Sequence, residues 1–161
     1  MKLSDNSYYV TEATVDKINI ITWNPELEQE RKSAVFDLLN NGKFKLLKSK
    51  ETGPYKINIK LIEWKLILNI TDLFDSTNKE IKLSISGVRR IMRDYQIVCD
   101  NYVEAIKTAP LKKIEAIDIG RRTIHDEGAE ILLNAFQEKV ELDMDTARRL
   151  FTLISIISLK I

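Results

Sequence analysis

The arginines are the residues of this chain whose spacing points most clearly to a chemical role, because seven of the eight fall in three short clusters. A guanidinium group presents its N–H donors in a planar fork that holds carboxylate or phosphate oxygens in pairs, which a lysine ammonium cannot do. Lys outnumbers Arg by 17 to 8, so the positions that keep Arg indicate a need for this fork. The three clusters are Arg89, Arg90 and Arg93; Arg121 and Arg122; and Arg148 and Arg149.

Carboxylates within the same expected helix account for three of these arginines. Residues four apart lie on one face of a helix, and an acid–base pair at that spacing contributes roughly 0.2–0.5 kcal/mol. The pairs predicted on this basis are Asp118 with Arg122, Asp145 with Arg149, and Asp94 with Arg90.

Four arginines have no partner predicted within their own helix: Arg89, Arg93, Arg121 and Arg148. Arg89 and Arg93 are four residues apart, so they repel each other unless an anion lies between them. Two interpretations stay open. The partner is a carboxylate from another helix, or it is an external anion such as a phosphate, a nucleotide, a carboxylate metabolite or an acidic protein surface. The internal candidates are Glu104, Glu115, Asp126 and Glu127.

The single histidine, His125, is a candidate general acid or base. Otherwise it is a polar residue satisfied by a neighbouring backbone group or carboxylate. No second metal ligand lies within one turn on its helical face, and Asp118 is roughly 10 Å away along the axis, so no metal site is predicted. The chain also lacks a P-loop, a dinucleotide-binding glycine fingerprint, a paired-cysteine zinc motif and a nucleophile elbow. No cofactor is predicted.

Helices and strands of the N-terminal half must help to position these residues. A helix is expected to begin at Asn24-Pro25-Glu26 and to end at Gly42, because glycine readily adopts the left-handed conformation of a helix end. Apolar and polar residues then alternate in three stretches, 55–61, 66–70 and 81–85. This period of two is typical of half-buried antiparallel strands, so the sheet is expected to have one solvent-exposed face.

After residue 86 nearly every apolar position follows a helical period. One helix, whose apolar stripe runs to Ile106, ends at Pro110. The next is expected to be continuous or kinked across Gly120 and Gly128, the alternative being a break with a functional loop at Gly120. Asp143 is expected to cap a last helix, which is apolar on nearly all sides and therefore central. The predicted fold class is α+β, with an antiparallel sheet from the N-terminal half packed against a C-terminal bundle of three helices.

Composition limits the class of protein. A chain of 161 residues is expected to form one domain, 1–161. Its 25 basic and 24 acidic residues disfavour a general nucleic-acid binder, which normally carries a strongly basic surface. The N-terminus has no apolar run typical of a secretory signal, and the apolar stretch 150–161 is shorter than the ~18 residues of a membrane span. A cytoplasmic location without a membrane anchor is therefore expected.

Three segments stand out as possible family signatures: Gly53-Pro54-Tyr55, residues 115–122 followed by His125, Glu127 and Gly128, and residues 143–153. They resemble the signature segments of a small uncharacterised protein family, of the UPF series, found in alphaproteobacteria. The resemblance extends from about residue 26 to residue 153. It implies a bacterial cytosolic protein of about this length, and it brings no activity, cofactor or catalytic residue because none is assigned to the family.

The arginine clusters and His125 support three hypotheses of function. The leading one is a non-catalytic binding or regulatory module whose arginine-lined surface recognises an anionic small molecule or an acidic protein surface. The alternative is a small enzyme acting on a phosphorylated or carboxylated substrate, with His125 as acid or base. The sequence leaves open whether the chain is catalytic or oligomeric. The candidate anion-binding residues are Arg89, Arg93, Arg121, Arg122, Arg148 and Arg149.

A weaker hypothesis is nucleic-acid binding through a basic edge. This edge consists of Lys43, Lys45, Lys48 and Lys50. Such an edge is more often a solvated strand or loop that discourages pairing with another sheet.

Overall fold

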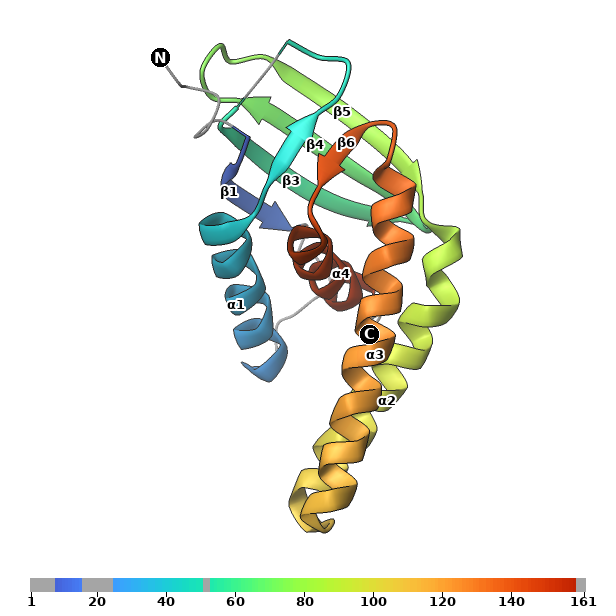
Figure 1. Ribbon diagram of the computed structural model, residues 1–161. Coiled ribbons are helices and arrows are strands. Elements are labelled where there is room, and N and C mark those ends of the chain that lie inside the picture. Colours follow the sequence, from blue (N-terminus) through green and yellow to red (C-terminus); the bar gives the residue numbers. More distant parts are fainter. Residues whose placement is uncertain (1–7, 16–24, 51–52, 159–161) are drawn as a thin grey trace.

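The computed structural model describes residues 8–15, 25–50 and 53–158. In this part of the chain, helices lie against one face of a four-stranded sheet (Figure 1). The class is α+β, as predicted. The elements are β1 Val10–Val15, α1 Pro25–Asn41, β2 Phe44–Leu46, β3 Tyr55–Ile62, β4 Lys65–Asp72, β5 Asn78–Ser84, a 3-10 turn Ser86–Val88, α2 Arg89–Thr108, α3 Leu111–Phe136, β6 Val140–Leu142 and α4 Met144–Ser158.

The main sheet has the strand order β1-β3-β4-β5. The three predicted strands β3, β4 and β5 are antiparallel, as their alternation indicated. The prediction of a wholly antiparallel sheet is wrong, because β1 pairs with β3 in parallel. The helix α1 lies between them in the chain, and a strand that returns through a helix runs in the same direction. A register shift between Val10 and Glu12 interrupts the alternation of β1 and hid it in the sequence.

A second, two-stranded sheet joins the two halves of the chain. Strand β2 pairs antiparallel with β6, so Phe44 lies opposite Leu142 and Leu46 opposite Val140. The expected division into an N-terminal sheet and a C-terminal helical bundle is therefore not complete. A strand from the C-terminal half is needed to cover β2.

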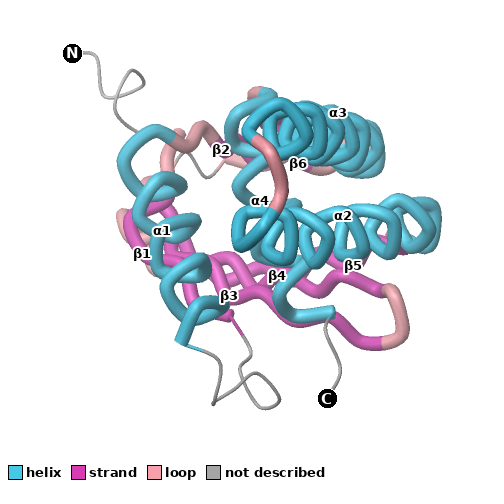
Figure 2. The backbone as a smooth tube through the Cα atoms, turned by 90° about the horizontal axis from the view of Figure 1, so that it is seen from below, coloured by secondary structure: helices cyan, strands magenta, loops and turns pink. Residues whose placement is uncertain are grey.

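The helix α4 occupies the centre of the helical layer, between α1 on one side and α2 and α3 on the other (Figure 2). Its prediction as a buried, central helix is confirmed by six buried apolar residues along its length. The predicted cap is also confirmed, because Asp143 accepts a hydrogen bond of 3.0 Å from the Thr146 N–H. The buried apolar residues are Ala147, Leu150, Phe151, Leu153, Ile154 and Ile156.

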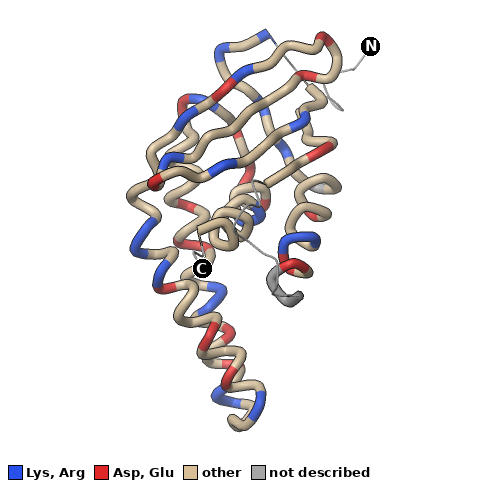
Figure 3. The backbone as a smooth tube through the Cα atoms, turned by 180° about the vertical axis from the view of Figure 1, so that it is seen from behind, with Lys and Arg blue, Asp and Glu red and all other residues tan. Residues whose placement is uncertain are grey.

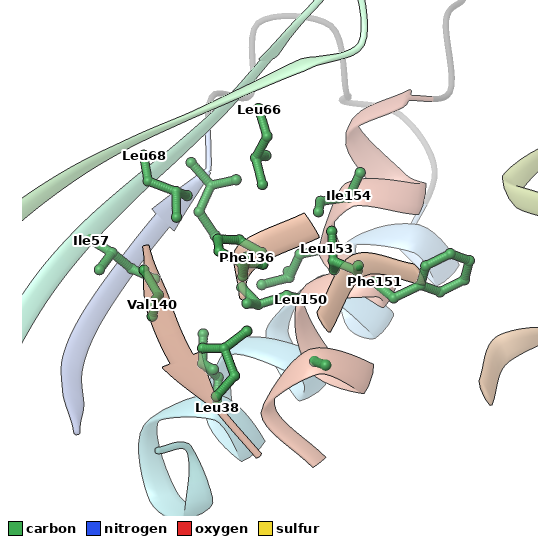
Figure 4. Close-up of a cluster of buried hydrophobic side chains, with 14 of the residues drawn as sticks. Leu38, Ile57, Leu66, Leu68, Phe136, Val140, Leu150, Phe151, Leu153 and Ile154 are labelled. Atoms are coloured by element: carbon green, nitrogen blue, oxygen red, sulfur yellow. The ribbon is translucent and has the colours of Figure 1, made fainter. Parts of the chain in front are cut away.

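The sheet and helices share one core (Figure 4). Ile57, Leu66 and Leu68 of the sheet face Phe136 and the residues of α4. Phe151 also belongs to α4, but its ring points away from the sheet (Figure 4). It packs instead against residues of α2 and α3.

Glycines end or cross the helices in different ways. The helix α3 is continuous across Gly120 and Gly128, so the alternative of a functional loop at Gly120 is excluded. The predicted left-handed conformation at Gly42 is wrong. Among the glycines of the described residues, Gly53 has a positive φ, of 83°, and Gly42 does not. Gly42 is needed for space instead, because a Cβ atom there would overlap the carbonyl oxygen of Leu38. Asn24, on which the predicted helix start depended, lies outside the described residues.

The antiparallel helices α2 and α3 extend beyond the rest of the fold as a two-helix arm (Figure 1). No third helix covers the far end of the arm in the described structure. Ile106 is therefore 52% exposed, although the apolar stripe predicted it to be buried. Leu111, at the start of α3, is 68% exposed for the same reason. Within the described segments, no helix has the length and apolarity to cross a bilayer.

A buried carboxylate holds the turn between β4 and β5. Asp72 is 2% exposed and accepts hydrogen bonds from the N–H groups of Gly53 at 2.9 Å, Phe74 at 2.8 Å and Asp75 at 3.2 Å. Through these contacts one side chain joins the start of β3 to the loop after β4.

Candidate functional site

A pocket of about 480 Å³ opens between α1, α3 and α4, with Tyr95 of α2 in its wall. It brings together four of the six candidate arginines and the candidate His125. Two of the arginine clusters, which are far apart in the sequence, thus meet at one place. The lining residues are Glu30, Ser33, Ala34, Asp37, Tyr95, Arg121, Arg122, His125, Asp126, Arg148, Arg149 and Thr152.

The arginines of α4 are paired across the helices. Arg148 donates from Nε to Asp126 of α3 at 2.8 Å and from Nη1 to Asp145 of its own helix at 2.6 Å. An internal carboxylate from another helix was one of the two predicted interpretations, and Asp126 is such a partner. The predicted pair of Asp145 with Arg149 is wrong, because Arg148 takes Asp145 and Arg149 lies 3.6 Å from Asp37 of α1.

The arginines of α3 share one carboxylate. The predicted pair of Asp118 with Arg122 is confirmed at 3.2 Å. Arg121 was expected to lack a partner in its own helix, but three residues is also a neighbouring spacing, and its Nη2 lies 2.6 Å from Asp118. Its guanidinium group also lies 5.5 Å from the centre of the Tyr102 ring. The hydrogen bond from Arg121 holds the pKa of Asp118 below its usual range.

These ion pairs do not use all the donors of the guanidinium groups. Within the described residues, Arg148 bonds through Nε and Nη1, Arg149 through Nε, and Arg122 through Nη2. Each of the three groups therefore keeps at least one Nη nitrogen for another acceptor. A carboxylate that fixes one edge of a guanidinium group also restricts where its other edge points.

His125 is half-buried and neutral. Its Nε2 atom lies 2.8 Å from Oγ1 of Thr152, and the Thr152 hydroxyl donates its one proton to the Arg148 carbonyl at 3.2 Å. Nε2 must then be the donor to Thr152, so Nδ1 carries the lone pair. The ring lies edge-on to Tyr95 and Phe151, with centroids 5.2 and 5.0 Å away. The expected backbone or carboxylate partner is thus replaced by a hydroxyl.

Burial is the main reason that the pKa of His125 is lowered to about 4, with the charges of Arg121, Arg149 and Arg148 acting in the same direction and Asp126 opposing them. Burial raises the pKa of the Glu30 carboxyl on the opposite wall, where Arg121 opposes the effect. A histidine with so low a pKa is a neutral imidazole near neutral pH, so it lacks the imidazolium proton that a general acid transfers. It is also a weak base.

We expect the stability of the protein to fall as the pH drops from about 6.5 to about 4. In this window His125 is protonated in the unfolded chain but neutral in the folded chain. The unfolded state therefore binds more protons and is stabilised relative to the folded state. The loss is at most about 3 kcal/mol. Urea unfolding at a series of pH values measures it. The same plot of unfolding free energy against pH for His125→Gln contains the effects of the carboxylates alone, so the difference between the two plots is the contribution of His125. Identical plots for the two proteins would contradict the lowered pKa of His125.

The other two candidate arginines lie elsewhere. Arg89 and Arg93 line a separate pocket beside Trp64, so the six candidates divide between two sites. Asp94 was predicted to pair with Arg90, and no such ion pair occurs among the described residues. The larger pocket also contains three ionisable residues that were not among the predicted site residues, namely Glu30 and Asp37 of α1 and Tyr95 of α2.

The remaining candidates are dispersed. The basic edge flanks the short strand β2, where Lys45 lies 5.0 Å from the centre of the Tyr8 ring. Lys and Arg are interspersed with Asp and Glu over the sheet and the helices (Figure 3). Cys99 is half-buried on α2, and burial raises the pKa of its thiol. No three His, Cys, Asp or Glu side chains in the described ranges are grouped so as to hold a metal ion.

Comparison with known proteins gives a family. Residues 8–160 match the uncharacterised protein family UPF0262. The chain is similar to a UPF0262 protein of Dinoroseobacter shibae, with 39% identity over 153 residues that cover 92% of this chain and 96% of the relative. It is also similar to a UPF0262 protein of Brucella anthropi, with 42% identity over 133 residues and 83% of each chain covered. No solved structure matches the chain.

Proposed function

The chain belongs to the uncharacterised protein family UPF0262, and we propose that it is a non-catalytic binding module whose pocket between α1, α3 and α4 holds an anionic small molecule. The resemblance predicted from the three signature segments is confirmed by this match and by the alphaproteobacterial relatives. The names of those relatives carry no activity, so the proposal rests on the pocket.

The observation that carries the proposal is the convergence of four guanidinium groups on one pocket. Arg121 and Arg122 come from α3, and Arg148 and Arg149 come from α4. Their carboxylate partners hold them in place, which reduces the entropy that a ligand must remove on binding. The free Nη nitrogens can then donate to carboxylate or phosphate oxygens in charge-assisted hydrogen bonds. A volume of about 480 Å³ suits a small molecule.

The charge of the lining limits the charge of the ligand. The four arginines face three carboxylates, those of Glu30, Asp37 and Asp126, so the formal charge of the lining is +1. A ligand with one negative charge is balanced by this surface, whereas a polyanion would be repelled by the three carboxylates. This balance favours a small carboxylate or a single phosphate group over a nucleotide triphosphate.

The same geometry weighs against the enzyme hypothesis. A catalytic His125 should titrate near neutral pH, but burial lowers its pKa to about 4. We therefore assign His125 to the wall of the pocket as a neutral polar group.

We expect a binding anion to raise the melting temperature of the protein. At a concentration about 100 times the Kd, a ligand adds about 2.7 kcal/mol to the free energy of unfolding, which corresponds to roughly 5–10 °C for a chain of this size. Thermal-shift measurements with inorganic phosphate, mononucleotides and dicarboxylates at constant ionic strength provide the test.

A double variant identifies the site of binding. In a background with Arg89→Gln and Arg93→Gln, which removes the arginines of the separate pocket beside Trp64, Arg122→Gln with Arg149→Gln removes two weakly paired guanidinium groups, so the upward shift should largely disappear. Arg90→Gln is the matched control, because Arg90 is exposed and lines neither pocket, and it should keep the full shift. A wild-type protein that responds to none of these anions, or a double variant that keeps the shift, would overturn the proposal.

A further inference from the structure

A second pocket, of about 260 Å³, lies at the start of α2, on the side that faces the turn between β3 and β4 and the end of α4. Of the residues that the structure describes, none lines both this pocket and the larger one. Its lining is Trp64, Arg89, Met92, Arg93, Gln96 and Ser158.

Among the described residues, no acidic side chain lines this second pocket, which sets it apart from the first. Arg89 and Arg93 are both exposed, and within the described residues neither forms an ion pair with a carboxylate. They are one helical turn apart, with Cβ atoms separated by about 6 Å, so their charges repel each other. The lining has a formal charge of +2, and nothing inside the described fold neutralises it.

The walls of the second pocket are fixed by contacts that do not involve the arginine donors. Trp64 sits in a tight turn with φ of 63°, and its carbonyl accepts the Ile85 N–H at 2.8 Å. The guanidinium group of Arg89 lies 5.9 Å from the centre of the Trp64 ring, which restricts its position. Gln96 donates to the Ser155 carbonyl at 3.2 Å and to Oγ of Ser158 at 3.0 Å. The donors left for a ligand therefore include those of the two guanidinium groups.

We propose that Arg89 and Arg93 bind the phosphate group of a small phosphate monoester between them. The dianion matches the formal charge of +2, and its three terminal oxygens can accept from both planar forks. A single carboxylate would neutralise only one of the two arginines. The volume of about 260 Å³ holds a phosphate group and a few further atoms. This site does not depend on the function proposed for the larger pocket.

The fluorescence of Trp64 gives a direct test. The chain has two tryptophans, so Trp23→Phe leaves Trp64 as the single indole. We expect inorganic phosphate and glycerol phosphate to change its emission with saturation, while chloride at the same ionic strength does not. In the same background, Arg89→Gln with Arg93→Gln should raise the Kd at least about tenfold, because charge-assisted hydrogen bonds are lost. Arg90→Gln, on the same turn of α2, should stay within about twofold.

Two further measurements separate this site from the larger pocket and from an effect of folding. Binding should persist in the double variant Arg122→Gln with Arg149→Gln, and its loss there would place the phosphate in the larger pocket and overturn this proposal. Calorimetric titration of the Arg122→Gln, Arg149→Gln variant with Trp23 intact should give the same Kd, and far-UV circular dichroism confirms that each variant is folded. An unsaturable response, or an equal loss of affinity in Arg90→Gln, would also overturn it.

Discussion

Replacing Gly128 by alanine should lower the free energy of unfolding by about 2 kcal/mol, although alanine is the better helix former. A Cβ atom at this position would overlap Cε1 and Cζ of the Phe151 ring. That ring is fully buried, and it lies edge-on to Tyr95 and His125 with centroids 5.4 and 5.0 Å away. These contacts restrict how far the ring can move. The cost of overpacking, up to about 3 kcal/mol, therefore exceeds the helix-propensity gain of about 1 kcal/mol.

Gly120 provides the matched control in the same helix. A Cβ atom there meets nothing within 4 Å, so Gly120→Ala should gain the full propensity term and stabilise the protein by about 1 kcal/mol. Urea unfolding followed by far-UV circular dichroism measures both variants. The packing of α3 against α4 would be misassigned if the two substitutions shifted the stability in the same direction.

The second large effect is expected at Asp72. Asp72→Ala should cost about 3 kcal/mol, because it leaves the N–H groups of Gly53, Phe74 and Asp75 without their acceptor, and the first of these bonds is buried. Chemical denaturation gives the loss, and the slope of the transition should stay unchanged because the folded core is the same.

Asp75→Ala is the control for this substitution. Asp75 lies in the same turn but is exposed, and its carboxylate accepts the Thr77 N–H at 2.9 Å. Exposed hydrogen bonds contribute about 1 kcal/mol or less. A loss at Asp75 as large as the loss at Asp72 would show that the buried carboxylate does not hold the turn.

The elements that the sequence predicted well are those with unbroken periodicity. The alternation in β3, β4 and β5 and the helical period of α2, α3 and α4 each depend on residues that are close in the chain. The strand β1 was missed because its alternation is interrupted and because its partner β3 follows a whole helix later. The prediction of a left-handed conformation at Gly42 was wrong because glycine is required there for space. A glycine in the sequence does not reveal which of these two requirements it meets.

The candidate site shows the same limit. The sequence located the arginines and His125, and it found the pair of Asp118 with Arg122 because both residues share a helix face. It could not find Asp37 as the partner of Arg149, since that contact depends on how α1 packs against α4. Arg89 and Arg93 were predicted to lack partners within their helix, and in the described structure they also lack carboxylates from other elements.

The pairing of β2 with β6 has a consequence for the order of events during synthesis. The Lys43 N–H donates to the Thr146 hydroxyl at 2.8 Å, across 103 positions of the chain. At about 5–20 residues per second, a ribosome needs on the order of 5–20 s to make the partner of β2 after β2 itself. Throughout that interval Phe44 and Leu46, which end up buried, lack the strand that covers them. The nascent chain therefore presents an apolar strand edge to chaperones until β6 has been made.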